Sequence, residues 1–124
     1  MKLSRLLLLL FVAVLPVAAC HHHDHNLSVT VKETGDSYRF RAEYPRKETG
    51  RIYRFINQEL SSAHIFESAD DVMDITTTLN DNTRFYVKSR PGSLLISVQR
   101  DENSSASYAR IKQLCADISN HLKN

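Results

Sequence analysis

Four histidines and an aspartate stand together near the start of the chain, and their chemistry is the easiest to name. The run consists of His21, His22, His23, Asp24 and His25. Imidazole nitrogens and carboxylates are ligands for Zn²⁺, Ni²⁺ and Cu²⁺. Consecutive histidines lack the spacing of a preorganised site, so a captured ion must order the chain and binds weakly. The other interpretation is a polar spacer, whose imidazoles gain charge at about pH 6.

The residues before this run have the pattern of an export signal. Lys2 and Arg5 form a short basic region, and apolar residues then continue without a break from 6 to 15. A helix that spans a bilayer needs about 20 apolar residues, so this run has the length of a signal-peptide core instead. Pro16 ends the run, and small residues follow it.

The end of this segment has a recognisable motif, Val17-Ala18-Ala19-Cys20. It resembles the lipobox of bacterial lipoproteins, and the resemblance covers residues 1–20 only. It implies that 1–19 is a signal removed before Cys20 and that lipid is attached at the Cys20 thiol. An ordinary secretory signal cut after Ala19, with a free Cys20 thiol, is the alternative.

The resemblance also implies a location. Residues 20–124 would be held on a membrane of the cell envelope without a spanning helix, and two or three acyl chains attach a protein stably where one is marginal. His21 follows the cysteine where an Asp would favour the inner membrane of a Gram-negative cell. In a Gram-negative cell we therefore expect the outer membrane rather than the inner one, with the protein facing the periplasm.

The two cysteines do not predict a disulfide. If the Cys20 sulfur carries lipid, Cys115 is left as a single thiol. Cys115 shares the apolar side of a predicted helix with Ile111 and Ile118, so we expect a buried small side chain. His121, six positions further along, falls on another helix face, which argues against a catalytic thiol.

The remainder of the chain predicts a short tether, 20–26, and one domain, 27–124. Alternation with period two predicts five strands, at 27–32, 38–44, 73–79, 84–88 and 94–99, and helical periodicity predicts helices at 48–63 and 104–122. Asn103 or Ser104 can cap the second helix. Short links between consecutive strands favour antiparallel pairing. The fold class is therefore α+β, with two helices on one face of a five-stranded, mainly antiparallel sheet in the order ββαβββα.

Charge is segregated along the chain although the net charge is only +2. Lys2 and Arg5 account for that excess, so the mature chain is neutral and overall basicity does not indicate nucleic-acid binding. Residues 39–54 carry a net charge of +4, and residues 59–81 carry −6. Binding by charge must therefore be local.

The strongest local candidate is the sheet face opposite the apolar one. Its cations are Arg39 and Arg41 on the second strand and Arg84 and Lys88 on the fourth, where Tyr86 lies between them in sequence. If the two strands lie near each other, these side chains form a basic face that suits an envelope protein with acidic groups, an anionic glycan or a lipid headgroup. The other interpretation is a solvated face whose charges discourage aggregation.

No motif for catalysis is present. The three glycines are isolated, and neither a His-Glu-x-x-His helix nor a Gly-x-Ser-x-Gly turn occurs. One group of polar residues is equally typical of a loop and helix caps: Ser61, Ser62, His64, Asp70, Asp71 and Asp74. We expect a non-enzymatic, membrane-anchored binding module without a cofactor, and metal capture by the histidine run is the alternative function.

Overall fold

Five strands pair side by side in the order β1-β2-β5-β4-β3, and every pair of neighbours is antiparallel. The computed structural model describes residues 26–61 and 63–124. Its elements are β1 (Ser28–Glu33), β2 (Ser37–Glu43), α1 (Thr49–Leu60), β3 (Met73–Thr78), β4 (Arg84–Arg90), β5 (Ser93–Gln99) and α2 (Ser105–Lys123). This is the α+β fold and element order that the sequence predicts.

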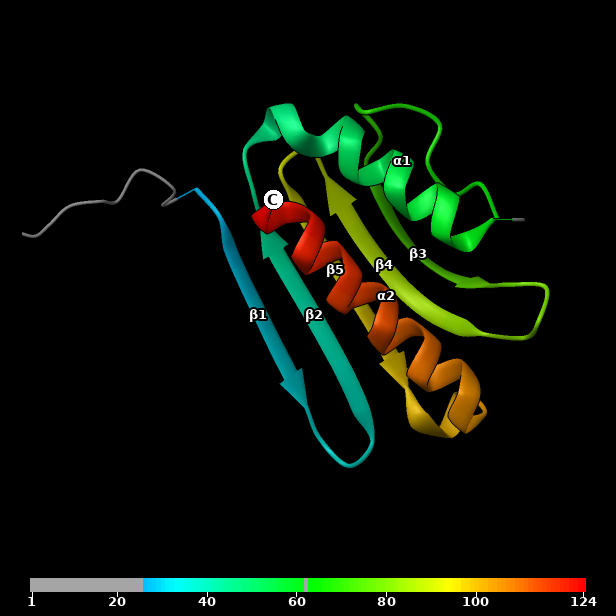
Figure 1. The fold of residues 1–124 in the computed structure, drawn as a ribbon. Coiled ribbons are helices and arrows are strands. Elements are labelled where there is room, and N and C mark those ends of the chain that lie inside the picture. Colours follow the sequence, from blue (N-terminus) through cyan, green and yellow to red (C-terminus); the bar gives the residue numbers. More distant parts are fainter. Residues whose placement is uncertain (1–25, 62) are drawn as a thin grey trace, which may run out of the picture.

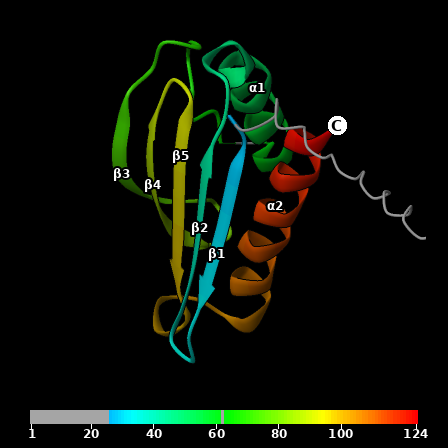
Figure 2. The same ribbon diagram turned by 90° about the vertical axis from the view of Figure 1, so that its left-hand side faces the viewer.

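Both helices lie on the same face of the sheet, and no part of the described chain covers the other face (Figure 1). The view along the sheet in Figure 2 shows these two layers edge-on. None of the helices in the described ranges is long and apolar enough to cross a bilayer.

The core lies between the sheet and the helices. The inward-facing residues of β2 are Tyr38, Phe40 and Ala42, and all three are buried, as their alternation predicts. Ile52 and Ile56 of α1 meet them from the helix layer and are almost completely buried. Burial of each large apolar side chain contributes about 1.5–3 kcal/mol, which holds the two layers together.

Individual residues determine where the two helices begin and end. Ser104 caps α2, because its Oγ accepts a hydrogen bond from the Ser107 amide at 3.0 Å. Asn103, the other predicted cap, instead donates its side-chain amide to the Gln99 carbonyl at 2.9 Å. A one-turn 3₁₀ helix, Arg46–Glu48, precedes α1, so the α-helix begins one residue later than predicted. A left-handed φ of 47° at Ser61 ends α1.

Strand β1 is less buried than its alternation suggests. The sequence predicts Val31 on the core side, and yet this residue is 51 % exposed. The reason is the strand order, because β1 is an edge strand and α2 packs against β2 and β5.

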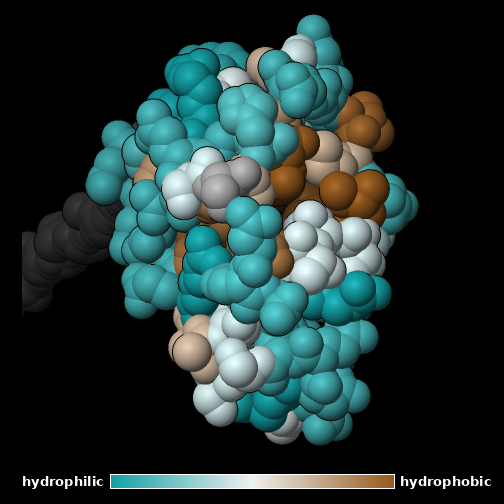
Figure 3. Space-filling view, turned by 90° about the vertical axis from the view of Figure 1, so that its right-hand side faces the viewer, coloured by the Kyte–Doolittle hydropathy of each residue, from teal (hydrophilic) through white to brown (hydrophobic). Residues whose placement is uncertain are grey.

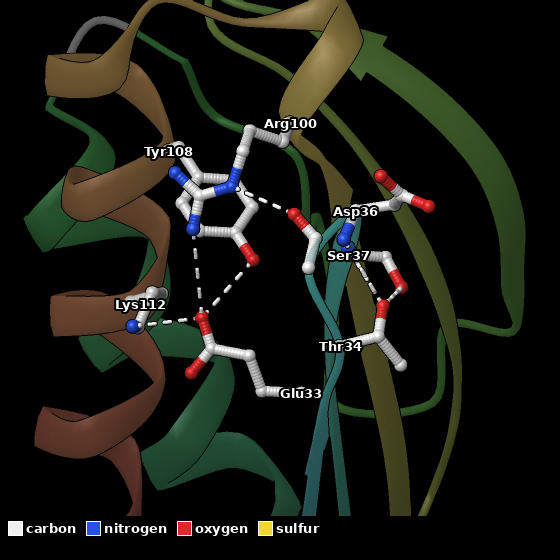
Figure 4. A network of polar contacts seen from close by, with 8 residues as sticks. Glu33, Thr34, Asp36, Ser37, Arg100, Tyr108 and Lys112 are labelled. Carbon is white, nitrogen blue, oxygen red and sulfur yellow. Dashed lines mark hydrogen bonds and ion pairs between the residues drawn. The ribbon is translucent and has the colours of Figure 1, made fainter.

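A polar network joins the end of β1 to α2, in addition to the apolar packing of β2 (Figure 4). The Glu33 carboxylate accepts hydrogen bonds from the Tyr108 hydroxyl at 3.1 Å and from Lys112 Nζ at 2.9 Å. Arg100 lies 3.9 Å from the same oxygen. The Lys112 contact, followed by the Tyr108 bond, lowers the pKa of Glu33.

The turn between β4 and β5 joins both layers at one end of the domain. Gly92 has a φ of 86°, as a type II turn with Pro91 before it requires. Its amide donates to Thr49 Oγ1 at 2.9 Å, and its carbonyl accepts from the Tyr44 amide at 2.9 Å. The turn therefore positions the start of α1 and the end of β2.

Candidate functional site

The uncovered sheet face is built from rows of side chains that cross β2, β5 and β4. Because β5 lies between β2 and β4, residues from strands far apart in sequence become neighbours. The register gives three rows: Arg39–Ser97–Tyr86, Arg41–Leu95–Lys88 and Glu43–Ser93–Arg90. Strands are about 4.8 Å apart, so the outer members of each row lie about 10 Å from each other.

A shallow hollow of about 320 Å³ lies on this face. Three cations line it, Arg41, Lys88 and Arg90, and Leu95 is the apolar residue between the first two. Leu95 is only 8 % exposed although it points away from the core. The hollow thus combines an apolar floor with positive charge on both sides, and we call it the basic hollow.

The carboxylates around the basic hollow already have hydrogen-bond donors. Glu43 Oε2 accepts from Ser93 Oγ at 2.9 Å, and Asp74 Oδ1 accepts from the Tyr86 hydroxyl at 2.6 Å. That bond to Asp74 raises the pKa of Tyr86. The Ser93 and Tyr86 hydroxyls thus donate their hydrogen bonds to carboxylates of the same face.

Four cations of this face have no partner of opposite charge within ion-pair distance among the described residues: Arg39, Arg41, Lys88 and Arg90. The lining of the basic hollow has three cations and two carboxylates, so its net charge is +1. Because none of these cations is held in an ion pair, they are available to an anionic ligand.

Arg84, the fourth predicted cation, has a different environment. It lies 3.7 Å from Glu102 and donates to Thr78 Oγ1 at 3.4 Å. It is also absent from the lining of the basic hollow. The structure therefore brings Arg41 and Lys88 together in the basic hollow. Arg39 lies one row away on the same face, outside the hollow, and Arg84 is held in an ion pair on that face.

The site contains residues that the sequence analysis did not single out. Arg90 has the same strand parity as Arg84, Tyr86 and Lys88, so continuing the alternation into the turn would have found it. Leu95 is an apolar residue at an outward position of a strand, and apolar groups on an outer face can mark an interaction site. Neither residue could be assigned to a hollow without the strand order.

The exposed apolar surface continues beside the basic hollow. Val72, which lines the hollow, is 76 % exposed. Ile75 on β3 is 41 % exposed, but it pairs with the buried Val87 and so lies on the helix side of the sheet. Figure 3 shows the side of the molecule that carries the β3 edge, with apolar side chains gathered at one end among polar ones. A ligand of the hollow can therefore contact apolar and cationic groups together.

In the part of the chain that the structure describes, the other polar candidates do not form a site with the basic hollow or with one another. Asp71 Oδ2 accepts from the backbone amides of Glu67 and Ser68 at 2.7 and 3.2 Å, so it orders its own loop. Asp70 and His64 are exposed, and Ser62 lies outside the described residues. Within residues 26–61 and 63–124, His, Cys, Asp and Glu side chains form no group of three that could hold a metal ion.

Cys115 is completely buried, as predicted, and burial raises the pKa of its thiol. The ring of His121 stacks on Phe55 of α1 with 4.4 Å between ring centroids. This packing gives both residues a structural role in the helix layer.

Cys20 and the histidines His21, His22, His23 and His25 lie outside the described residues. Comparison of the chain with protein families, with characterised proteins and with solved structures finds no match. The function proposed below therefore depends on the residues and their geometry.

Proposed function

We propose that this protein is a lipid-anchored protein of the bacterial cell envelope that binds an anionic envelope component on its uncovered sheet face. The lipobox resemblance at residues 17–20 supports the anchor. The observation that carries the binding role is the row Arg41–Leu95–Lys88, in which unpaired cations flank an apolar floor.

The chemistry of the basic hollow selects a class of ligand. Arg41 and Arg90 offer guanidinium groups that bind carboxylates or phosphates with two parallel hydrogen bonds. Leu95 and Val72 favour a ligand that also has an apolar part. An envelope protein that presents an acidic side chain beside an aliphatic or aromatic one has this combination, so we propose a protein partner.

In this role the protein is a binding module and not an enzyme. The hollow contains cations and two hydrogen-bonded carboxylates, and the one buried thiol lies in the core with its pKa raised. Binding then depends on the shape and charge of the basic hollow, whose side chains are positioned by the antiparallel sheet.

Site-specific photocrosslinking in cells tests this proposal. A photoreactive residue in place of Thr76 lies on the uncovered face, because Thr76 is exposed and pairs with Tyr86. The matched control replaces Ala116, an exposed residue of α2 in the helix layer. We expect a defined protein adduct from position 76 and none from position 116. The same adducts from both positions, or none from either, would contradict the proposal.

The anchor has a separate test. Cys20→Ala should release the protein from the membrane fraction, because the lipidated thiol is then missing. Retention of this variant in membranes would remove the lipoprotein part of the proposal without affecting the crosslinking result.

A further inference from the structure

A second cationic surface lies at the end of the domain where the described chain begins. Asn26 and the end of β2 border two shallow hollows there. Four cations line them: Arg51 of α1, which is paired with Glu48, and three others. The other three are Arg46 and Lys47, from the 3₁₀ turn before α1, and Lys123 at the end of α2. We call Arg46, Lys47 and Lys123 the end cluster.

The end cluster is exposed and has no carboxylate partner. All three side chains are exposed, and none takes part in an ion pair among residues 26–61 and 63–124. Glu48, which directly follows Lys47 in sequence, is already bound to Arg51 at 2.7 Å. Glu43, which borders the second hollow, accepts a hydrogen bond from Ser93 and forms no ion pair with Arg46. The three cations of the end cluster are therefore available to an anionic surface.

The short tether places this end next to the proposed anchor. The chain from Cys20 to Asn26 has six peptide links, so it reaches at most about 20 Å even when fully extended. The strands run away from this end over a length of about 23 Å, given seven residues in β2. The β1–β2 turn at the opposite end cannot approach the anchor as closely.

We propose that the end cluster docks on anionic phospholipid headgroups, so that the domain stands on the membrane by this end. The inference depends on the lipid anchor of the proposed function for its place in the cell. Charge complementarity supports it, because each Lys or Arg near an anionic bilayer adds about a fivefold gain in partitioning. In this orientation the strands point away from the membrane, and the uncovered sheet face stays open to a partner beside it.

Vesicle flotation tests docking without the lipid anchor. The protein used is the mature chain, 20–124, with Cys20→Ser, which retains every buried core residue from Tyr38 to Ile118. The probes are vesicles of phosphatidylcholine alone and of phosphatidylcholine mixed with phosphatidylglycerol. The test variant is Arg46→Gln/Lys47→Gln/Lys123→Gln. The matched control removes three cations from the sheet face, Lys32→Gln/Arg39→Gln/Arg41→Gln.

We expect binding to the anionic vesicles only, with loss of binding at about 500 mM salt, where charges are screened within about 4 Å. The test variant should lose about a hundredfold in partitioning, and the control should keep at least most of its binding. Circular dichroism and thermal unfolding of both variants check that they are folded.

Equal losses in the two variants, or unchanged binding of the test variant, would overturn the docking proposal. Because this protein carries no lipid, neither result bears on the anchor, which the Cys20→Ala fractionation tests by itself. Failure of docking by the end cluster can therefore be distinguished from failure of the lipid anchor.

Discussion

Replacement of Gly92 by alanine should destabilise the fold by about 2–3 kcal/mol. The left-handed φ of 86° costs a residue with a Cβ about 1–2 kcal/mol. The added Cβ would also lie 3.1 Å from the Tyr44 carbonyl oxygen and 3.2 Å from Arg46 Cγ. Movement of Tyr44 weakens its 2.9 Å amide bond to Gly92, and a backbone hydrogen bond contributes about 0.5–1.5 kcal/mol.

Urea unfolding followed by circular dichroism measures this loss, and Gly35→Ala is the matched control. Gly35 lies in the β1–β2 turn, where an added Cβ has no heavy atom within 4 Å. Its φ is not positive, so the control should remain within about 1 kcal/mol of wild type, on the stabilising side. Equal free energies of unfolding for the two variants would refute the argument from the Gly92 turn.

Three further predictions concern single groups. Glu33 has a pKa below its ordinary value of 4.5, so its carboxylate stabilises the fold above that pH and the contribution is lost as the pH falls; Glu33→Gln should flatten this acid loss in urea titrations, and an unchanged pH profile would contradict it. Cys115 should resist thiol reagents in the native protein and react on unfolding, because it is 0 % exposed; rapid native labelling of a Cys20→Ser chain would show otherwise. The histidine run should bind Zn²⁺ or Ni²⁺ weakly, and binding should disappear when His21, His22, His23 and His25 are all changed to Ser; calorimetric titration with equal affinity for both chains would exclude metal capture there.

The layers of this fold could be predicted from local pattern alone. In β2, the alternation of Tyr38, Phe40 and Ala42 with charged residues requires one buried and one solvated face, and the structure has both. The apolar stripe of α1 likewise requires a sheet beneath it. Such patterns act over a few residues, so one sequence is enough to detect them.

The site needed information that local pattern does not contain. The pairing of β2 with β5 joins Arg41 to Leu95, and no short turn links those strands. From the sequence alone, Arg41 and Lys88 are neighbours only if the second and fourth strands are assumed to lie near each other. The ion pair between Arg84 and Glu102 is also nonlocal, so the sequence does not reveal it. The sequence therefore predicts Arg84 as a binding residue, although it does not line the basic hollow.

The central claim is that unpaired cations of the uncovered sheet face bind an acidic partner. The most direct measurement is the yield of the crosslinked adduct from position 76 in an Arg41→Gln/Lys88→Gln protein. An Arg54→Gln protein, changed at an exposed cation of α1, is the control. We predict that the double variant loses most of the adduct while the control keeps it. An undiminished adduct from the double variant would contradict the account.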